Sequence, residues 1–125
     1  RVKFGPWFDA PSDDPLSCCA LDVPVTEFGC QGLELDMPVV CWGKDLAWLG
    51  TDWALTPKRR RDPVDDPHQL LINCYRVLLT RGRDGFVVFL PPIDELDATE
   101  VALLAAGVLP LPTAAEYTTP ARRFA

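Results

Sequence analysis

The stretch from Thr26 to Asp36 combines residue types that suit phosphate binding. Thr26 is expected at the end of a short strand, glycines follow at positions 29 and 32, and Glu34 lies in the first turn after Gly32. A strand end that leads into a helix N-terminus presents backbone N–H groups to an anion, and glycine lets the backbone approach that anion closely. An ordinary strand–turn–helix corner, with Glu34 as a first-turn acid, would produce the same pattern.

A second stretch, residues 73–83, ends a predicted helix with Thr80 and Arg81. In the functional interpretation, Arg81 reaches a transferring phosphoryl group, because its planar fork and fixed charge stabilise developing negative charge. In the structural interpretation, Arg81 is a cation near a helix C-terminus, where the helix dipole favours positive charge. The residue types alone leave both interpretations open.

A run of four consecutive cations is the densest positive charge in the chain, and it consists of Lys58, Arg59, Arg60 and Arg61. It is a solvated basic loop, a partner for the acids at positions 62, 65 and 66, or an insertion that contacts nucleic-acid phosphates. Trp48 and Trp53 lie nearby and are candidates for stacking on bases, whereas Trp42 follows an apolar run and is expected in the core.

Composition limits the classes of protein that the chain can be. With 125 residues, 48% hydrophobic and 24% charged, it can form one folded domain or part of one, which excludes wholesale disorder. No apolar run approaches the roughly 18 residues of a membrane helix. The net charge of −6 argues against nucleic-acid binding by bulk electrostatics, so any such binding must rest on a few well-placed cations.

The five cysteines and the single histidine leave little material for metal chemistry. The cysteines include the adjacent pair Cys18 and Cys19, but no C-x-x-C pair. We expect reduced structural thiols in a cytoplasmic protein. His68 is the only histidine, so we predict no metal site.

Strand and helix signals alternate along the chain. Apolar and β-branched runs predict strands at 21–28, 39–42 and 86–90. A short helical turn is expected at 33–36, a helix from Pro67 to about Arg81, and a last helix capped by Asp97 or Thr99 and ending before Gly107. The remaining segments are expected to be irregular: a lead-in at 1–20, an insertion at 43–67 and a loose tail at 110–125.

This order predicts an α/β fold with a mainly parallel sheet and flanking helices. Only about three strands are visible, fewer than such sheets usually carry. The sequence begins with Arg1 and its only methionine is Met37, in mid-chain. We therefore expect residues 1–125 to be a single partial domain, cut from a longer protein.

The two chemically suggestive stretches together resemble motifs V and VI of superfamily 1 helicases. Residues 26–36 read T-x-x-x-x-Q-G-L-E-x-D, and residues 77–82 read V-x-L-T-R-G after the apolar strand. The resemblance is closest to the branch with Q-G-x-E in motif V and to Schlafen-type helicase domains, and it covers residues 21–92. It implies a partial RecA-like domain of the P-loop NTPase type, the second of the two halves of a helicase.

The resemblance also implies roles for individual residues. Thr26 would contact the phosphates of single-stranded DNA or RNA. Independently of the resemblance, the basic run 58–61 would do the same if it is an insertion that binds the strand. Gln31 and Gly32 would lie at the cleft between the two RecA-like domains, and Glu34 would bond the ribose of ATP. Arg81 would be the arginine finger that contacts the γ-phosphate. Phe28 stands where many relatives have a histidine, so the hydrogen bond of that histidine is lost.

Two elements of an ATPase are absent from the sequence: a G-x-x-x-x-G-K-[ST] phosphate loop and an apolar strand ending in two acids. We therefore expect ATP and Mg²⁺ to bind only in the longer parent, with the N-terminal RecA-like domain of the same chain as partner, and the isolated chain to be inactive. The alternative is a degenerate RecA-like module that binds protein or RNA without catalysis. A nuclease built on Glu34, Asp36, Lys44 and Asp45 is a third hypothesis, but their order fits no familiar pattern.

Overall fold

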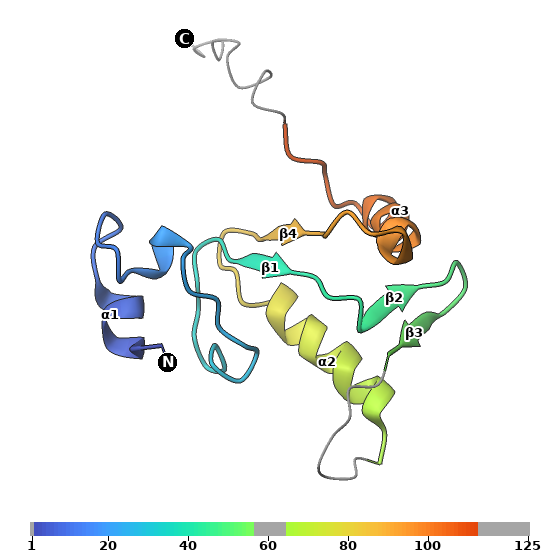
Figure 1. Cartoon of the computed structure of the whole chain (residues 1–125), viewed down its shortest axis with the longest axis horizontal. Coiled ribbons are helices and arrows are strands. Elements are labelled where there is room, and N and C mark those ends of the chain that lie inside the picture. The colour runs from blue at the N-terminus through green and yellow to red at the C-terminus, as the bar shows by residue number, and fades with distance from the viewer. Residues whose placement is uncertain (1, 57–64, 113–125) are drawn as a thin grey trace. The chain divides into compact units, whose positions relative to one another are not determined.

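A computed structural model describes residues 2–56 and 65–112 of the chain. Figure 1 shows its helices and strands. The elements are α1 (Phe4–Asp9), η1 (Cys18–Ala20), β1 (Val39–Cys41), β2 (Leu46–Trp48), β3 (Trp53–Leu55), α2 (Pro67–Leu79), β4 (Val87–Phe89), η2 (Asp94–Leu96) and α3 (Asp97–Ala105). The chain divides into two compact units, the first made of Arg1–Val40 and Gln69–Val87, the second of Cys41–His68 and Val88–Ala125. The predicted mixed α/β class is confirmed.

Strands β1 and β4 are hydrogen-bonded neighbours and run parallel (Figure 1). The N–H of Val87 donates to the carbonyl oxygen of Pro38, and the N–H of Trp42 donates to that of Phe89, each at 2.9 Å. Val40 is buried, as expected for the centre of a short apolar strand. Both strands were predicted from their apolar runs, and both are confirmed, although each is shorter than its run.

Helix α2 begins at Pro67, as the sequence predicts. Proline suits the first position of a helix because its fixed φ is helical and its missing N–H would be unpaired there anyway. The apolar face of the helix includes Tyr75, which is buried, and Val77 and Leu78, which are half-buried. The helix ends at Leu79, so Thr80 and Arg81 lie immediately beyond its last turn.

The lead-in at 1–20 contains a short helix, α1, where an irregular segment was expected. Trp7 explains why this segment is structured, because its ring is buried and its Nε1 donates to the carbonyl oxygen of Val23 at 3.2 Å. Phe4 adds an edge-on ring contact to Trp7, with centroids 6.4 Å apart. The aromatic side chains of the lead-in therefore contact each other and the backbone at Val23.

Two predictions for the segment that follows are wrong. Residues 21–28 form no strand: Leu21 has a left-handed φ of 57°, and the chain turns from residue 27 onward. The predicted helical turn at 33–36 is also absent, since Leu35 forms an isolated parallel bridge with Gly82. Pro24 and the exposed side chains of Leu21 and Val23 fit a segment that pairs with no strand.

The second unit contains an antiparallel hairpin, β2–β3, inside the segment expected to be an irregular insertion. Its register pairs Leu46 with Leu55, Ala47 with Ala54 and Trp48 with Trp53. The hairpin closes at Leu49, whose N–H donates to the carbonyl oxygen of Asp52 at 2.9 Å, with Gly50 at a φ of +95°. Glycine adopts this left-handed conformation without the steric cost of a Cβ.

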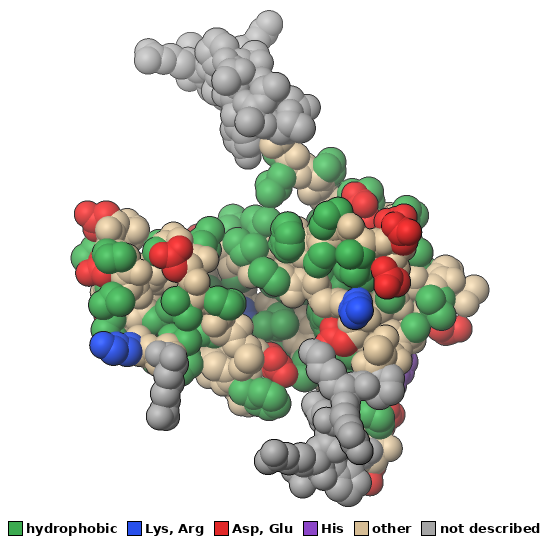
Figure 2. Space-filling view, viewed as in Figure 1, with side chains coloured by type: hydrophobic (Ala, Val, Ile, Leu, Met, Phe, Trp, Pro, Cys, Tyr) green, Lys and Arg blue, Asp and Glu red, His purple; other side chains and the backbone are tan. Residues whose placement is uncertain are grey.

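Helix α3 ends where the sequence predicts. Gly107 has a φ of +98°, and its N–H donates to the carbonyl oxygen of Leu104 at 3.0 Å, while Val108 donates to Leu103 at 3.1 Å. These two bonds form a Schellman motif, which satisfies carbonyls at the end of the helix. Acidic residues lie where α3 begins, as Figure 2 shows by the red side chains there. Negative charge at a helix N-terminus is favoured by the helix dipole.

Neither Asp97 nor Thr99 caps α3, so that prediction is wrong: Leu96 is at the N-cap without a side-chain hydrogen bond, Asp97 is the first residue of the helix, and Thr99 is its third. The residue is fully buried inside the helix, and its Oγ1 accepts a hydrogen bond from the N–H of Trp48 at 2.9 Å. The Thr99 hydroxyl thus provides a hydrogen-bond acceptor for the N–H of a strand residue inside the core of the second unit. Leu46, Ala47 and Leu96 complete this core together with Trp42.

Candidate functional site

The two motif-bearing stretches meet in the first unit. Leu35 and Gly82 form a parallel bridge in which the N–H of Leu35 donates to the carbonyl oxygen of Arg81 at 3.0 Å. The N–H of Arg83 donates to Leu35 at 2.7 Å, and that of Asp84 donates to Asp36 at 3.0 Å. Three backbone hydrogen bonds therefore join the end of the first stretch to the end of the second.

The second stretch reaches this bridge directly after the end of α2. The Thr80 hydroxyl contacts the carbonyl oxygens of Arg76 at 2.9 Å and Val77 at 3.1 Å, and so helps to satisfy the last turn of the helix. Gly82 follows, and a Cβ at this position would overlap the carbonyl of Gly85 and lie 2.9 Å from Cδ of Pro38. Only glycine lets the chain pass this close to its own following turn.

Arg81 is half-buried, and its guanidinium is held by backbone carbonyls. Its Nε donates to Val77 at 3.2 Å, one turn earlier in α2, and its Nη1 donates to Leu33 at 3.4 Å. Within residues 2–56 and 65–112, no carboxylate forms an ion pair with it. The side chain therefore links the helix end to the first stretch, while no acid of the described residues neutralises its positive charge.

Residues 26–33 form successive turns, so the expected strand end and helix N-terminus are absent. The N–H groups of Gly29 and Cys30 donate to the carbonyl oxygen of Thr26 at 2.9 and 3.1 Å, and Gly29 also approaches Thr26 Oγ1 at 3.4 Å. The N–H of Leu33 donates to Cys30 at 3.0 Å. These donors are used within the loop, so the prediction that a helix N-terminus cradles an anion here is wrong.

Cys30 anchors this loop from inside. It is buried, and its Sγ donates to the carbonyl oxygen of Glu27 at 3.4 Å. Burial raises the pKa of the thiol, and the nearby charge of Arg81 offsets only part of that rise. Cys30 is thus a protonated packing residue beneath the loop and next to Arg81.

The remaining residues predicted for nucleotide and strand contacts lie on the surface of the same loop. Thr26, Gln31, Gly32 and Glu34 are all exposed, and Gly32 has a left-handed φ of +82°. Glu34 directly precedes the residue that bridges to Gly82. The structure therefore brings the loop that carries Glu34 to the segment that carries Arg81.

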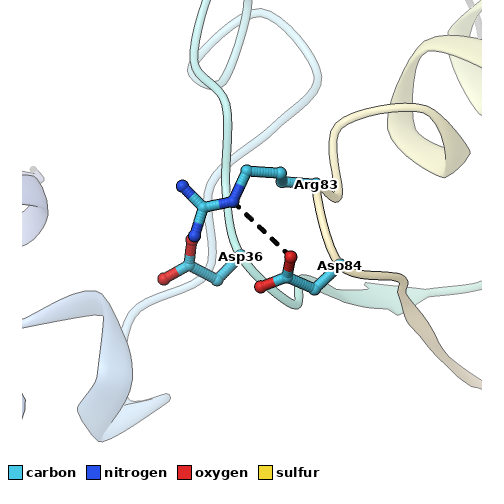
Figure 3. Close-up of polar contacts among 3 residues, drawn as sticks. All are labelled: Asp36, Arg83 and Asp84. Carbon is cyan, nitrogen blue, oxygen red and sulfur yellow. Dashed lines mark ion pairs between the residues drawn. The ribbon is translucent and has the colours of Figure 1, made fainter.

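Sequence reasoning missed a charged cluster at the same bridge (Figure 3). Arg83 Nη2 forms an ion pair with Asp36 Oδ1, and Arg83 Nε lies 3.5 Å from Asp84 Oδ1. The charge of Asp36, followed by Asp84, raises the pKa of Arg83. All three side chains are exposed. The opposite charges at the ends of the two stretches were the signal that could have suggested this pair.

The other predicted strand-contact residues divide into two groups. Lys58, Arg59, Arg60 and Arg61 lie outside the described residues. Trp42 is buried, as expected, and its Nε1 donates to the carbonyl oxygen of Leu46 at 2.8 Å. Trp53 packs against both Trp42 and Trp48, with ring centroids 5.9 and 5.2 Å apart. These three tryptophans therefore form one packed group in the second unit.

The described residues offer no site with the composition of a metal centre. In the part of the chain that the structure describes, no three His, Cys, Asp or Glu side chains come together as a candidate metal site. The five cysteines are free thiols. His68 Nε2 lies 3.0 Å from the carbonyl oxygen of Trp53. Nor does any helix of the described residues have the length and apolar character needed to cross a bilayer.

Comparison with protein families defines the class of the chain. Residues 2–92 match a family model, so the chain is a helicase-related domain. It belongs to the family described as Schlafen group 3, DNA/RNA helicase domain. No curated protein and no solved structure matches the chain. The resemblance to Schlafen-type helicase domains is confirmed at the level of the family.

Proposed function

We propose that this chain is part of the second RecA-like half of an ATP-dependent DNA or RNA helicase or translocase. In this proposal, Arg81 is the arginine finger, and the ATP is bound by the first RecA-like domain of the same parent chain. The observation that carries the proposal is the position of Arg81 next to the loop of residues 26–36, within a family of helicase domains.

The state of Arg81 supports a finger role. An arginine finger must present positive charge to the γ-phosphate, so it cannot be neutralised by its own chain. Nε and Nη1 of Arg81 are held by the carbonyl oxygens of Val77 and Leu33, while no described carboxylate pairs with the guanidinium. Carbonyl anchors orient the fork and leave the net charge available to a phosphate.

Arg83 makes a useful contrast, because it lies only two residues away. Its charge is balanced by Asp36 and Asp84. Among the described residues, a phosphate would have to compete with two carboxylates for Arg83 but with none for Arg81. Of the two arginines in the R-G-R sequence, Arg81 is therefore the better finger.

The exposed loop supplies the other proposed contacts. Glu34 bonds the ribose of ATP, Gln31 and Gly32 line the nucleotide side of the cleft, and Thr26 contacts the phosphates of a single strand. Their exposure in the described structure leaves them accessible to such ligands. The basic run 58–61 adds phosphate contacts to the same strand. Mg²⁺ accompanies the ATP in the parent protein.

The test compares ATP hydrolysis by the full-length parent and by its Arg81→Ala variant. Removal of an arginine finger lowers kcat by about 10³- to 10⁵-fold. Arg76→Ala is the matched control, since Arg76 is an exposed arginine on α2 whose guanidinium donates to Asn73. Unchanged hydrolysis in Arg81→Ala would reject the finger assignment.

A degenerate, non-enzymatic module is the second candidate. The sequence favours it because it lacks both a G-x-x-x-x-G-K-[ST] phosphate loop and an apolar strand ending in two acids, and the two carbonyl bonds of Arg81 would hold this loop equally well without catalysis. The sequence of the parent upstream of Arg1 separates the two candidates. A phosphate loop of the G-x-x-x-x-G-K-[ST] type supports the motor, and its absence supports the module.

A further inference from the structure

The ion pair between Arg83 and Asp36 joins the two motif-bearing stretches through side chains, next to the backbone bridge (Figure 3). Asp36 lies two residues after Glu34, and Arg83 lies two residues after Arg81. The pair is thus placed symmetrically with respect to the proposed ribose contact and the proposed finger. Neither member is needed for either contact itself.

The pair reinforces a small number of backbone bonds. Leu35 and Gly82 form an isolated bridge, with hydrogen bonds from Leu35 to Arg81, Arg83 to Leu35 and Asp84 to Asp36. The bridge lies outside the β1–β4 ladder, whose first hydrogen bond, from Val87 to Pro38, follows it along the same two segments. The side chains of Asp36, Arg83 and Asp84 close the same end of the bridge, and Asp84 contributes to both the backbone and the ionic contacts.

We propose that Arg83 and Asp36 are positioning residues, which fix the segment of Arg81 against the segment of Glu34 so that the finger and the ribose contact act on one nucleotide. The inference rests on the proposed function. Arg83 and Asp36 do not touch the nucleotide; they act through Arg81, whose Nη1 reaches Leu33 on the first stretch. Asp84 is a weaker second partner of Arg83, at 3.5 Å.

The two acids that contact Arg83 are expected to differ in their effect on the activity of the parent enzyme. Asp36 makes the closer pair with Arg83 and lies on the other stretch, whereas Asp84 is the next residue in sequence. Loss of Asp36 removes a link between the stretches, and loss of Asp84 removes only a local contact. Asp36→Asn is therefore expected to impair the parent enzyme more than Asp84→Asn does.

The experiment measures kcat and KM for ATP in the full-length parent and in four variants: Arg83→Ala, Asp36→Asn, Asp84→Asn and the double exchange Asp36→Arg/Arg83→Asp. Exposed ion pairs contribute little energy, so Arg83→Ala and Asp36→Asn are expected to lower kcat about two- to fivefold. KM for ATP stays unchanged, because Glu34 still bonds the ribose and only the alignment of the finger with the bound nucleotide is lost. The double exchange restores kcat, since a guanidinium and a carboxylate still face each other across the bridge with their positions swapped.

Salt and stability readouts separate positioning from general stabilisation. Added salt screens exposed pairs, so the ratio of wild-type kcat to Arg83→Ala kcat is expected to fall toward one as ionic strength rises. A purely structural role would lower the unfolding temperature without this change in kcat and without rescue by exchange. Unchanged kcat in Arg83→Ala, or a double exchange no better than the single variants, would overturn the proposal.

Measuring Arg81→Ala in the same series distinguishes rejection of the positioning role from rejection of the proposed function. If Arg81→Ala abolishes hydrolysis and Arg83→Ala does not affect it, the positioning role alone is rejected. If Arg81→Ala leaves hydrolysis intact, the finger assignment is rejected and the positioning role with it.

Discussion

Arg81 Nη1 donates a hydrogen bond to the carbonyl oxygen of Leu33, 3.4 Å away and 48 positions earlier in the chain. This contact joins the residue just beyond α2 to the loop that carries Gln31, Gly32 and Glu34. Because a second bond ties Arg81 Nε to Val77 in α2, the guanidinium is oriented from both sides. The packing that supports this arrangement and the chemistry proposed for it can be tested separately.

Gly82→Ala is expected to destabilise the first unit. The added Cβ would overlap the carbonyl of Gly85, so the bridge to Leu35 must shift, at a cost of about 1–3 kcal/mol. Urea unfolding of the chain measures the effect. Gly5→Ala is the matched control: Gly5 lies in α1, where an added Cβ would meet no atom within 4 Å beyond its own helix and chain neighbours, so alanine there should be neutral or stabilise by up to about 1 kcal/mol. Equal effects of the two substitutions would contradict the close approach at Gly82.

Thr99→Val is expected to destabilise the second unit although it preserves the shape of the side chain. The hydroxyl accepts the N–H of Trp48 in a fully buried position, and its loss leaves that donor unpaired at a cost of about 1–3 kcal/mol. Thr56→Val is the control, because Thr56 is exposed and its hydrogen bond to the carbonyl oxygen of Asp45 uses the backbone N–H. Thermal unfolding that is the same for Thr99→Val and wild type would refute the buried hydrogen bond.

Stability is expected to fall at alkaline pH through Cys30. Its folded-state pKa is raised above the unfolded value of 9.0, mainly by burial, so the native state binds more protons than the unfolded state above that pH. The contribution of Cys30 is therefore fully present below about pH 9 and is lost as the pH rises through the folded pKa.

The measurement is the free energy of unfolding as a function of pH, in wild type and in Cys30→Ala. The variant removes the titrating group, so its stability should decline less steeply above pH 9. Cys41→Ala serves as the control because Cys41 is an exposed free thiol. Parallel curves for wild type and Cys30→Ala would contradict a raised pKa at this buried thiol.

The basic run 58–61 is expected to strengthen binding of single-stranded nucleic acid. Replacing Lys58, Arg59, Arg60 and Arg61 by alanine in the parent should weaken binding of a single strand and make it less dependent on salt. Each lost phosphate contact reduces the slope of log K against log salt by about 0.7. A slope that does not change would assign the run to a solvated loop or to pairing with the neighbouring acids.

Local signals were sufficient to predict several elements. Pro67 marks the start of α2, the apolar runs mark β1 and β4, and Gly107 marks the end of α3. In each case the decisive property belongs to a few adjacent residues: a fixed φ, a continuous apolar segment, or a left-handed glycine. Tertiary packing then agrees with the local preference.

Predictions failed where a distant partner decides the conformation. Leu35 is extended because it bridges to Gly82, and Thr99 is buried because it accepts from Trp48 across 51 positions. The hairpin of β2 and β3 was missed for a local reason: it carries no strong turn dipeptide, and its three-residue strands are too short to show a clear alternation.

The site was predicted as two separate stretches, and the Arg83–Asp36 pair became visible only when these stretches were placed together.

The central claim, that Arg81 contacts the γ-phosphate as charge develops, is tested most directly by the affinity of the full-length parent for two ligands. ADP with aluminium fluoride imitates the transition state of phosphoryl transfer, whereas ADP alone does not. A finger binds the first and not the second. We predict that Arg81→Ala weakens binding of ADP–aluminium fluoride by at least about 100-fold and leaves the affinity for ADP within about twofold. Equal affinities of wild type and Arg81→Ala for ADP–aluminium fluoride would contradict the account.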